Sequence, residues 1–144
     1  NYELLKAVGQ IGKPVILKRG FSATVREWLL SAEYILLQGN PNVILCERGI
    51  RTFQKDMKNT VDLAAVATVK LKTNLPVIVD PSHATGNAKI VSNIALAATA
   101  VGADGVMLEV HNEPKNSISD SMQTISVTEF RKLTDKMYQI KKIL

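Results

Sequence analysis

Short apolar stretches alternate with longer amphipathic segments along the whole chain. The apolar stretches are rich in Val, Ile and Leu, which is typical of strands buried on both faces of a parallel sheet. We predict four such strands, at residues 14–17, 43–46, 76–79 and 105–108. Because each strand is followed by a helical pattern, the strands should run parallel and be joined by right-handed crossovers.

The amphipathic segments predict five helices, at residues 1–10, 24–37, 60–72, 90–101 and 126–144. Two of them begin with a capping box and the third with a single capping side chain. These capping residues are Thr24 with Glu27, Ser126 with Glu129, and Asn59 or Thr60. The apolar spacing predicts the buried sides of the second and fourth helices, formed by Trp28, Leu29, Ala32, Ile35 and Leu36, and by Ile94, Ala97, Ala98 and Val101.

Four strand–helix units predict an α/β fold, and no Pro/Gly/Ser-rich linker divides the chain into two domains. The units would form either a small open sheet or half of an eight-stranded (β/α)8 barrel. Every predicted strand ends in charged or reactive residues, and these ends share one side of the sheet. The mouth of a barrel explains that recurrence best.

Composition narrows the class of protein further. The 144 residues are 46% hydrophobic and 22% charged, with a net charge of +5 that is spread along the chain. This balance argues against a nucleic-acid surface and a membrane protein, and it allows small anionic substrates. The single cysteine, Cys46, excludes an internal disulfide and suits a reducing compartment, so we expect a cytoplasmic protein.

The candidate chemistry lies at the strand ends. After residues 76–79 come Asp80, Ser82 and His83, and we expect Pro81 and Gly86 to break regular structure there. The cationic ends suit phosphate and carboxylate groups, whereas His and carboxylate ends suit a divalent metal. The four ends carry Lys18 and Arg19, Glu47 and Arg48, Asp80 and His83, and Glu109 and His111.

Four runs of sequence resemble a known family. They are LKRGFSATVREWLLSAEYILLQGN, VILCERGIRTF, LPVIVDPSHATG and GADGVMLEVHNEP. They are similar to 3-deoxy-arabino-heptulosonate 7-phosphate (DAHP) synthase of type I, the form related to 3-deoxy-manno-octulosonate 8-phosphate synthase. The resemblance implies the second half of a (β/α)8 barrel, so residues 1–144 are expected to be one partial domain without the barrel's first half.

The resemblance also implies an activity and a metal. The family condenses phosphoenolpyruvate with erythrose 4-phosphate, releases phosphate, and opens the shikimate pathway to aromatic amino acids. It uses a divalent metal of the Mn, Fe, Co or Zn class, held by Cys, His, Glu and Asp. In this chain His83, Glu109 and Asp120 match three of those ligands. The family's cysteine ligand lies on the first barrel strand, and Cys46, on another strand, is expected to be a core residue.

The same resemblance assigns the substrate site. Lys18 and Arg48 match the residues that hold phosphoenolpyruvate, and with His83 they are the predicted catalytic residues. Further positions at the mouth complete the predicted substrate site: Arg19, Glu47, Arg51, Thr52 and Asp80. Of these, Asp80 could orient Lys18 or His83. Two alternatives stay open, because the strand parity of Arg19 also allows it to face the outer helices and His111 is equally well read as a rim residue.

Three other readings of the chain stay open. The octulosonate synthase acts on a longer sugar phosphate, the sialic acid synthases are more distant, and a half-barrel without catalytic activity could serve in assembly. A half-barrel also leaves two sheet edges exposed. We therefore expect a homo-oligomer, or a first half of the barrel that covers those edges.

Overall fold

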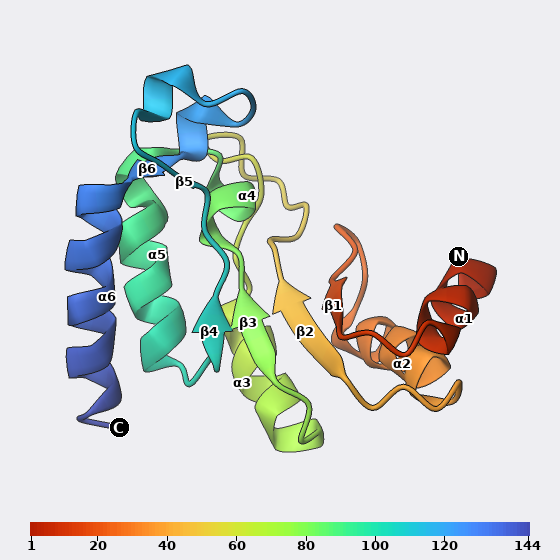
Figure 1. Cartoon of the computed structure of the whole chain (residues 1–144). Coiled ribbons are helices and arrows are strands. Elements are labelled where there is room, and N and C mark those ends of the chain that lie inside the picture. Colours follow the sequence, from red (N-terminus) through yellow and green to blue (C-terminus); the bar gives the residue numbers. More distant parts are fainter.

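A four-stranded parallel sheet is the centre of the fold. The computed structural model describes residues 1–144, and its strands lie in the order β1-β2-β3-β4. Figure 1 shows the strands side by side, with helices packed along the sheet. This arrangement confirms the predicted alternation of parallel strands and helices. The strands are β1 (Val15–Lys18), β2 (Val43–Glu47), β3 (Val77–Val79) and β4 (Gly105–Val106).

The fourth strand is shorter than predicted, and the cause lies in its neighbour. The Met107 amide donates to the Val79 carbonyl at 2.8 Å, and beyond Val79 the third strand turns into a helix. The fourth strand therefore has no backbone on which to continue the ladder. The chain pairs again only further on, where β5 (Val110–His111) runs parallel to β6 (Ile125–Ser126).

Five long helices pack along the sheet, and both predicted capping boxes are present. Asp62 caps the third long helix, in place of the predicted Asn59 or Thr60, because its carboxylate accepts the Ala65 amide. The long helices are α1 (Tyr2–Gln10), α2 (Val25–Leu36), α3 (Leu63–Lys72), α5 (Ala88–Ala100) and α6 (Val127–Lys141). No helix in the chain combines the length and apolar composition needed to span a membrane.

A further helix, α4 (Pro81–Thr85), stands where we expected regular structure to break. Proline is favoured at a first helical position, where its missing N–H is not needed. Gly86 ends the helix with a positive φ of 65°, which a glycine adopts without strain. The proline and the glycine thus delimit a single helical turn, and this turn carries His83. Two 3-10 turns, Pro114–Asn116 and Ser121–Gln123, lie in the loop between β5 and β6.

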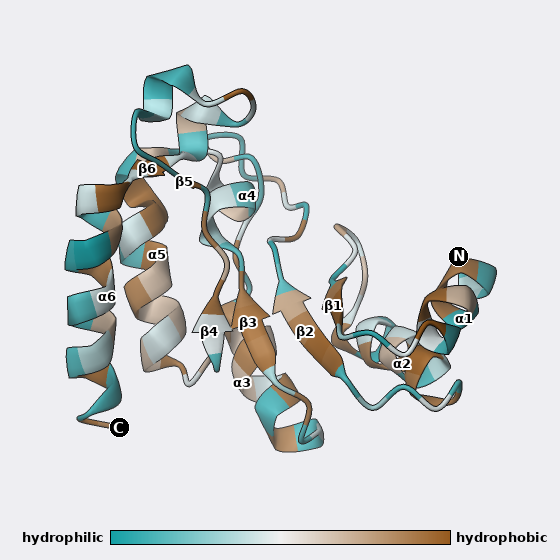
Figure 2. Cartoon of the chain, viewed as in Figure 1, coloured by the Kyte–Doolittle hydropathy of each residue, from teal (hydrophilic) through white to brown (hydrophobic).

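The core lies on one face of the sheet, between the strands and the helices. Val15, Leu17, Val43, Leu45, Val77 and Val79 face helices α2 and α3. On the opposite face Ile16 is 44% exposed and Ile44 and Ile78 are half-buried, whereas Cys46 is fully buried. Figure 2 shows apolar strands with hydrophilic residues gathered on the loops above them and on the outer side of α6.

The buried side of α5 differs from the predicted one. Its buried residues are Val91, Ala95, Ala98 and Thr99, so only Ala98 of the predicted set is buried. The helix is apolar on most sides, and periodicity alone could not select a face. The packing of α6 selects it, because Leu133 joins Val91 and Ala95 in a second apolar cluster.

Candidate metal and anion site

Polar side chains gather at the carboxyl ends of the four strands. Lys18 and Glu47 end the first two strands, Asp80 follows the third, and Glu109 lies three residues beyond the fourth. Because the strands are parallel, these ends share one edge of the sheet, where Figure 1 shows the loops converging. The edge is the one at which α/β enzymes carry their sites.

The predicted metal ligands come together at this edge. One ligand atom from each of His83, Glu109 and Asp120 lies within 4.8 Å of the others. His83 Nε2 is 3.3 Å from Glu109 Oε1 and 3.9 Å from Asp120 Oδ2. One imidazole nitrogen with two carboxylates is a suitable donor set for a divalent metal of the predicted class.

Asp80 connects this cluster to Lys18. Its carboxylate is fully buried, and Oδ1 accepts the His83 amide at 2.9 Å as the cap of α4. Its other oxygen, Oδ2, lies 2.8 Å from His83 Nδ1 and 3.0 Å from Lys18 Nζ. A carboxylate beside Nδ1 favours the tautomer that donates from Nδ1, which leaves the Nε2 lone pair for a metal. The carboxylate therefore orients both side chains, as we expected of at least one of them.

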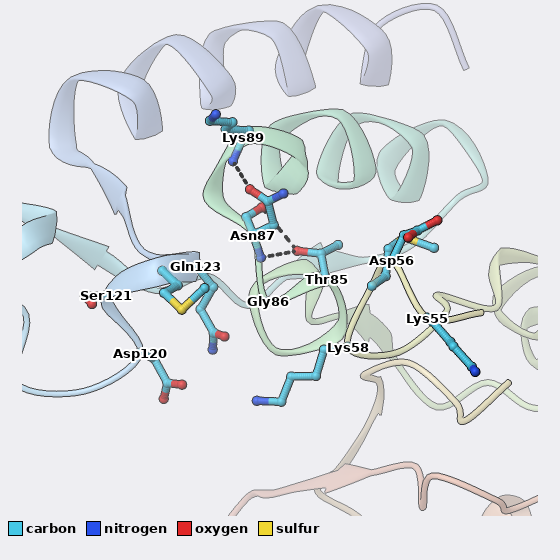
Figure 3. Close-up of a pocket in the computed structure, with 12 residues that line it drawn as sticks. Lys55, Asp56, Lys58, Thr85, Gly86, Asn87, Lys89, Asp120, Ser121 and Gln123 are labelled. Atoms are coloured by element: carbon cyan, nitrogen blue, oxygen red, sulfur yellow. Dashed lines mark hydrogen bonds between the residues drawn. The ribbon is translucent and has the colours of Figure 1, made fainter. Parts of the chain in front are cut away.

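Asp120 lies at the wall of a pocket of about 800 Å³. Its φ of 54° is the only positive value outside glycine, a conformation that aspartate tolerates. Figure 3 shows its carboxylate near the side chains of Gln123 and Lys58. Gln123 is 3% exposed and its amide nitrogen has no partner. No sequence signal distinguished Gln123 or Lys58, because the pocket is made by loops that are distant along the chain.

Arg48 stacks on an aromatic ring at the same edge. Its guanidinium carbon lies 4.2 Å from the ring centre of Phe21, and that of Arg51 lies 5.6 Å from the same ring. The Arg48 Nε is buried and has no hydrogen-bond partner. Cation–π stacking fixes the guanidinium without using its donors, which stay available for an anion. No sequence pattern distinguished Phe21, because its contact with Arg48 joins segments that are distant along the chain.

The side chains of Arg19 and Glu47 are buried and do not face the mouth at this edge. They differ in this from the substrate contacts that we predicted for them. Arg19 Nη1 lies 2.9 Å from Glu47 Oε2 and 3.0 Å from Asp62 Oδ2, with Arg19 5% exposed and Glu47 fully buried. Burial alone would lower the pKa of Arg19, but the two carboxylates outweigh it and raise the pKa above its ordinary value. Glu47 Oε1 also accepts the Gly49 amide at 2.7 Å. Because this hydrogen bond spans Arg48, we infer that the Arg19–Glu47 ion pair holds the backbone on which Arg48 lies.

The remaining predicted positions lie further out. Arg51 and Thr52 are exposed, and the Thr52 hydroxyl shares a hydrogen bond of 2.8 Å with the Thr60 hydroxyl. His111 is outside the cluster of ligands, and its Nδ1 accepts the Glu113 amide at 3.0 Å. This hydrogen bond within its own loop favours the reading of His111 as a rim residue.

Cys46 lies in the core, as expected. The side chain is fully buried. Burial, and then the charge of Asp80, raise the pKa of its thiol from 9.0 to about 12. The thiol is therefore protonated at neutral pH, and a protonated thiol is neither a nucleophile nor a metal ligand.

The raised pKa of Cys46 predicts a loss of stability in alkali. A thiol with a higher pKa in the folded state stabilises the fold fully below pH 9.0, and this contribution disappears as the pH rises toward about 12. We expect the free energy of unfolding to fall more steeply in the wild type than in Cys46→Ala, by up to about 1.4 kcal/mol per pH unit. Urea unfolding across this range measures both slopes. Equal slopes would contradict the burial of a neutral thiol.

A parallel sheet that gathers its charged side chains at the carboxyl ends of the strands has them where the (β/α)8 enzymes carry their active sites. The chain belongs to the DAHP synthetase I family, which it matches over residues 1–144. The family resemblance read from the sequence is thereby confirmed.

Several relatives support this assignment. The chain is 47% identical over 140 residues to a phospho-2-dehydro-3-deoxyheptonate aldolase of Thermotoga maritima, across 97% of this chain and 41% of that protein. A crystal structure of that DAHP synthase superposes with a TM-score of 0.96 at 46% identity, over 99% of this chain and 42% of the other. This confirms that the fold corresponds to half of the (β/α)8 barrel.

A second group of relatives is more distant. A 2-dehydro-3-deoxyphosphooctonate aldolase of Syntrophobacter fumaroxidans is 28% identical over 99% of this chain and 52% of that protein. The chain thus spans about half the length, or less, of the curated relatives it matches.

Proposed function

We propose that the chain forms part of a DAHP synthase, a transferase that condenses phosphoenolpyruvate with erythrose 4-phosphate and releases phosphate. The observation that carries the proposal is the hydrogen-bonded series from Lys18 through Asp80 to His83, with contacts of 3.0 and 2.8 Å. One buried carboxylate thereby holds a group for an anion and a group for a metal at a fixed separation. A condensation of an anionic donor with an aldehyde requires such mutual placement.

The anion side of the site is formed by Lys18 and Arg48. Lys18 supplies a point charge, and Arg48 supplies a planar fork suited to a phosphate or carboxylate. Phe21 fixes the Arg48 guanidinium from one side, and the Glu47–Gly49 hydrogen bond fixes its backbone. Phosphoenolpyruvate would therefore meet donors that are already in place, and little conformational entropy would be lost when it binds.

The metal side is formed by His83, Glu109 and Asp120, which fit a divalent metal of the Mn, Fe, Co or Zn class. When bound, such a metal polarises an aldehyde oxygen or lowers the pKa of a water. The Asp80 carboxylate favours a proton on His83 Nδ1, which leaves the lone pair of Nε2 available to ligate the metal. By family resemblance a cysteine outside these residues would be the fourth ligand.

Three further properties belong to the same proposal. The role implies the shikimate pathway and aromatic amino acid biosynthesis. The unpaired thiol of Cys46 supports a cytoplasmic location. The exposed side of the sheet around Ile16 supports assembly with further strands or with another copy.

The octulosonate synthase is the second candidate, since relatives 28% identical carry that function in their names. The higher identity of 47% to the Thermotoga maritima heptonate aldolase favours erythrose 4-phosphate as the aldehyde.

A chimera tests both candidate functions. In it this chain replaces the matching segment of the Thermotoga maritima enzyme, and phosphate release is measured with either sugar phosphate. We expect turnover with erythrose 4-phosphate, abolished by a chelator. A preference for arabinose 5-phosphate would establish the alternative, and turnover that survives chelation would contradict the metal site.

Arg48→Ala in this chimera should raise KM for phosphoenolpyruvate or lower kcat/KM by about 100-fold, the equivalent of a lost charge-assisted hydrogen bond of about 3 kcal/mol. Steady-state kinetics at varied phosphoenolpyruvate measure the effect. Arg131→Ala is the matched control, because Arg131 is exposed on α6 away from the site. Unchanged kinetics in Arg48→Ala would exclude this residue from the anion site.

A further inference from the structure

Ser82 replaces a backbone acceptor at the point where the sheet ends. The last rung between β3 and β4 is the hydrogen bond from the Met107 amide to the Val79 carbonyl, at 2.8 Å. Two residues later, the Glu109 amide would need the next carbonyl of a continuing third strand. The chain has turned into α4 there, and the Glu109 amide donates instead to Ser82 Oγ at 3.0 Å.

This hydrogen bond joins the two elements that carry the metal ligands. Ser82 precedes His83 in α4, and its hydroxyl holds the backbone of Glu109 beyond β4. From these contacts we infer that Ser82 is a positioning residue for the metal site: it sets the separation of His83 and Glu109. The inference rests on the proposed function, because it concerns the metal that those ligands would hold.

Burial makes the role of Ser82 specific. Ser82 is fully buried, so its hydroxyl is shielded from bulk water and is the acceptor that the structure gives the Glu109 amide. The carbonyl of Glu109 is held as well, since it accepts the Ile125 amide at 3.0 Å. Both backbone groups of Glu109 are therefore fixed, and its carboxylate starts from a defined position beside His83 Nε2, 3.3 Å away.

Ser82→Ala in the 144-residue chain tests the inference. We expect the Glu109 amide to exchange its hydrogen at least about tenfold faster, as measured by NMR, because its only acceptor is lost. We expect Co²⁺ to bind about 10–100-fold more weakly, as for other residues that orient metal ligands. The d–d absorption bands of the Co²⁺ complex should also shift, which a general loss of stability would not cause. Ser82→Thr keeps the hydroxyl and should retain the exchange rate and the affinity.

Thr99→Ala is the matched control. Thr99 is also buried and its hydroxyl also makes one hydrogen bond, to the Ala95 carbonyl at 2.9 Å, but it lies within α5. Equal losses of Co²⁺ affinity in Ser82→Ala and Thr99→Ala would overturn the inference. A Ser82→Ala variant with the amide exchange rate and Co²⁺ affinity of the wild type would overturn it as well. So would a Ser82→Thr variant that loses as much Co²⁺ affinity as Ser82→Ala. If the wild-type chain binds no Co²⁺, the proposed metal centre fails, and amide exchange at Glu109 alone decides the role of Ser82.

Discussion

Asp80→Asn should lower kcat/KM of the chimeric enzyme by about three orders of magnitude. The substitution removes the counter-ion of Lys18 and turns the group facing His83 Nδ1 from an acceptor into a possible donor. Loss of a carboxylate that orients a metal-binding histidine costs about 10–100-fold in metal affinity. Misplacement of Lys18 adds a loss of similar size on the phosphoenolpyruvate side. Steady-state kinetics and a metal titration separate the two parts.

Asp104→Asn is a matched control for this prediction. Asp104 lies at the opposite end of the sheet, where its carboxylate contacts Lys70 Nζ at 2.7 Å and accepts the Val77 amide at 2.7 Å. It therefore makes the same kinds of contact as Asp80, to a lysine and to a backbone amide. We expect Asp104→Asn to lower stability and to leave metal affinity unchanged. Similar kinetic losses in the two variants would show that Asp80 acts only through the stability of the fold.

Most of the fold could be predicted because its signals are local. The capping box of Thr24 and Glu27 and that of Ser126 and Glu129 lie within single turns, and both helices begin where those residues place them. The burial of β2 and β3 follows from composition alone. The buried face of α5 could not be predicted, because the choice depends on its contact with Leu133 of α6.

The candidate site likewise has features that could be predicted from the sequence and features that could not. The strand ends predicted that Lys18 and His83 share an edge of the sheet, but not that a single carboxylate oxygen of Asp80 contacts both. The roles of Phe21 and Ser82 depend on contacts between segments that are distant along the chain. Parity left open whether Arg19 faces the helices, and packing against Glu47 and Trp28 decides that it does.

The chain by itself should be catalytically silent, even though its candidate site residues lie together at one edge of the sheet. Its candidate metal ligands are His83, Glu109 and Asp120, without the cysteine that the family resemblance implies as a fourth ligand. The exposed sheet face around Ile16 is where further strands of a barrel would pack under the proposed function. Without them neither of the two proposed substrates would be fully oriented, and orientation supplies about 7–11 kcal/mol in well-aligned reactions, or at least five orders of magnitude in rate.

The decisive measurement compares the purified 144-residue chain with the chimera, using phosphoenolpyruvate, erythrose 4-phosphate and excess Mn²⁺. Phosphate release should be at least about 10⁵-fold slower in the chain alone. Circular dichroism and Co²⁺ binding serve as controls, because the strand–helix units bury their apolar faces locally and should fold without the rest of a barrel. Light scattering should reveal self-association, since the edges of β1 and β4 are unpaired. Phosphate release by the chain within tenfold of the chimera would show that four strand–helix units are sufficient for the reaction.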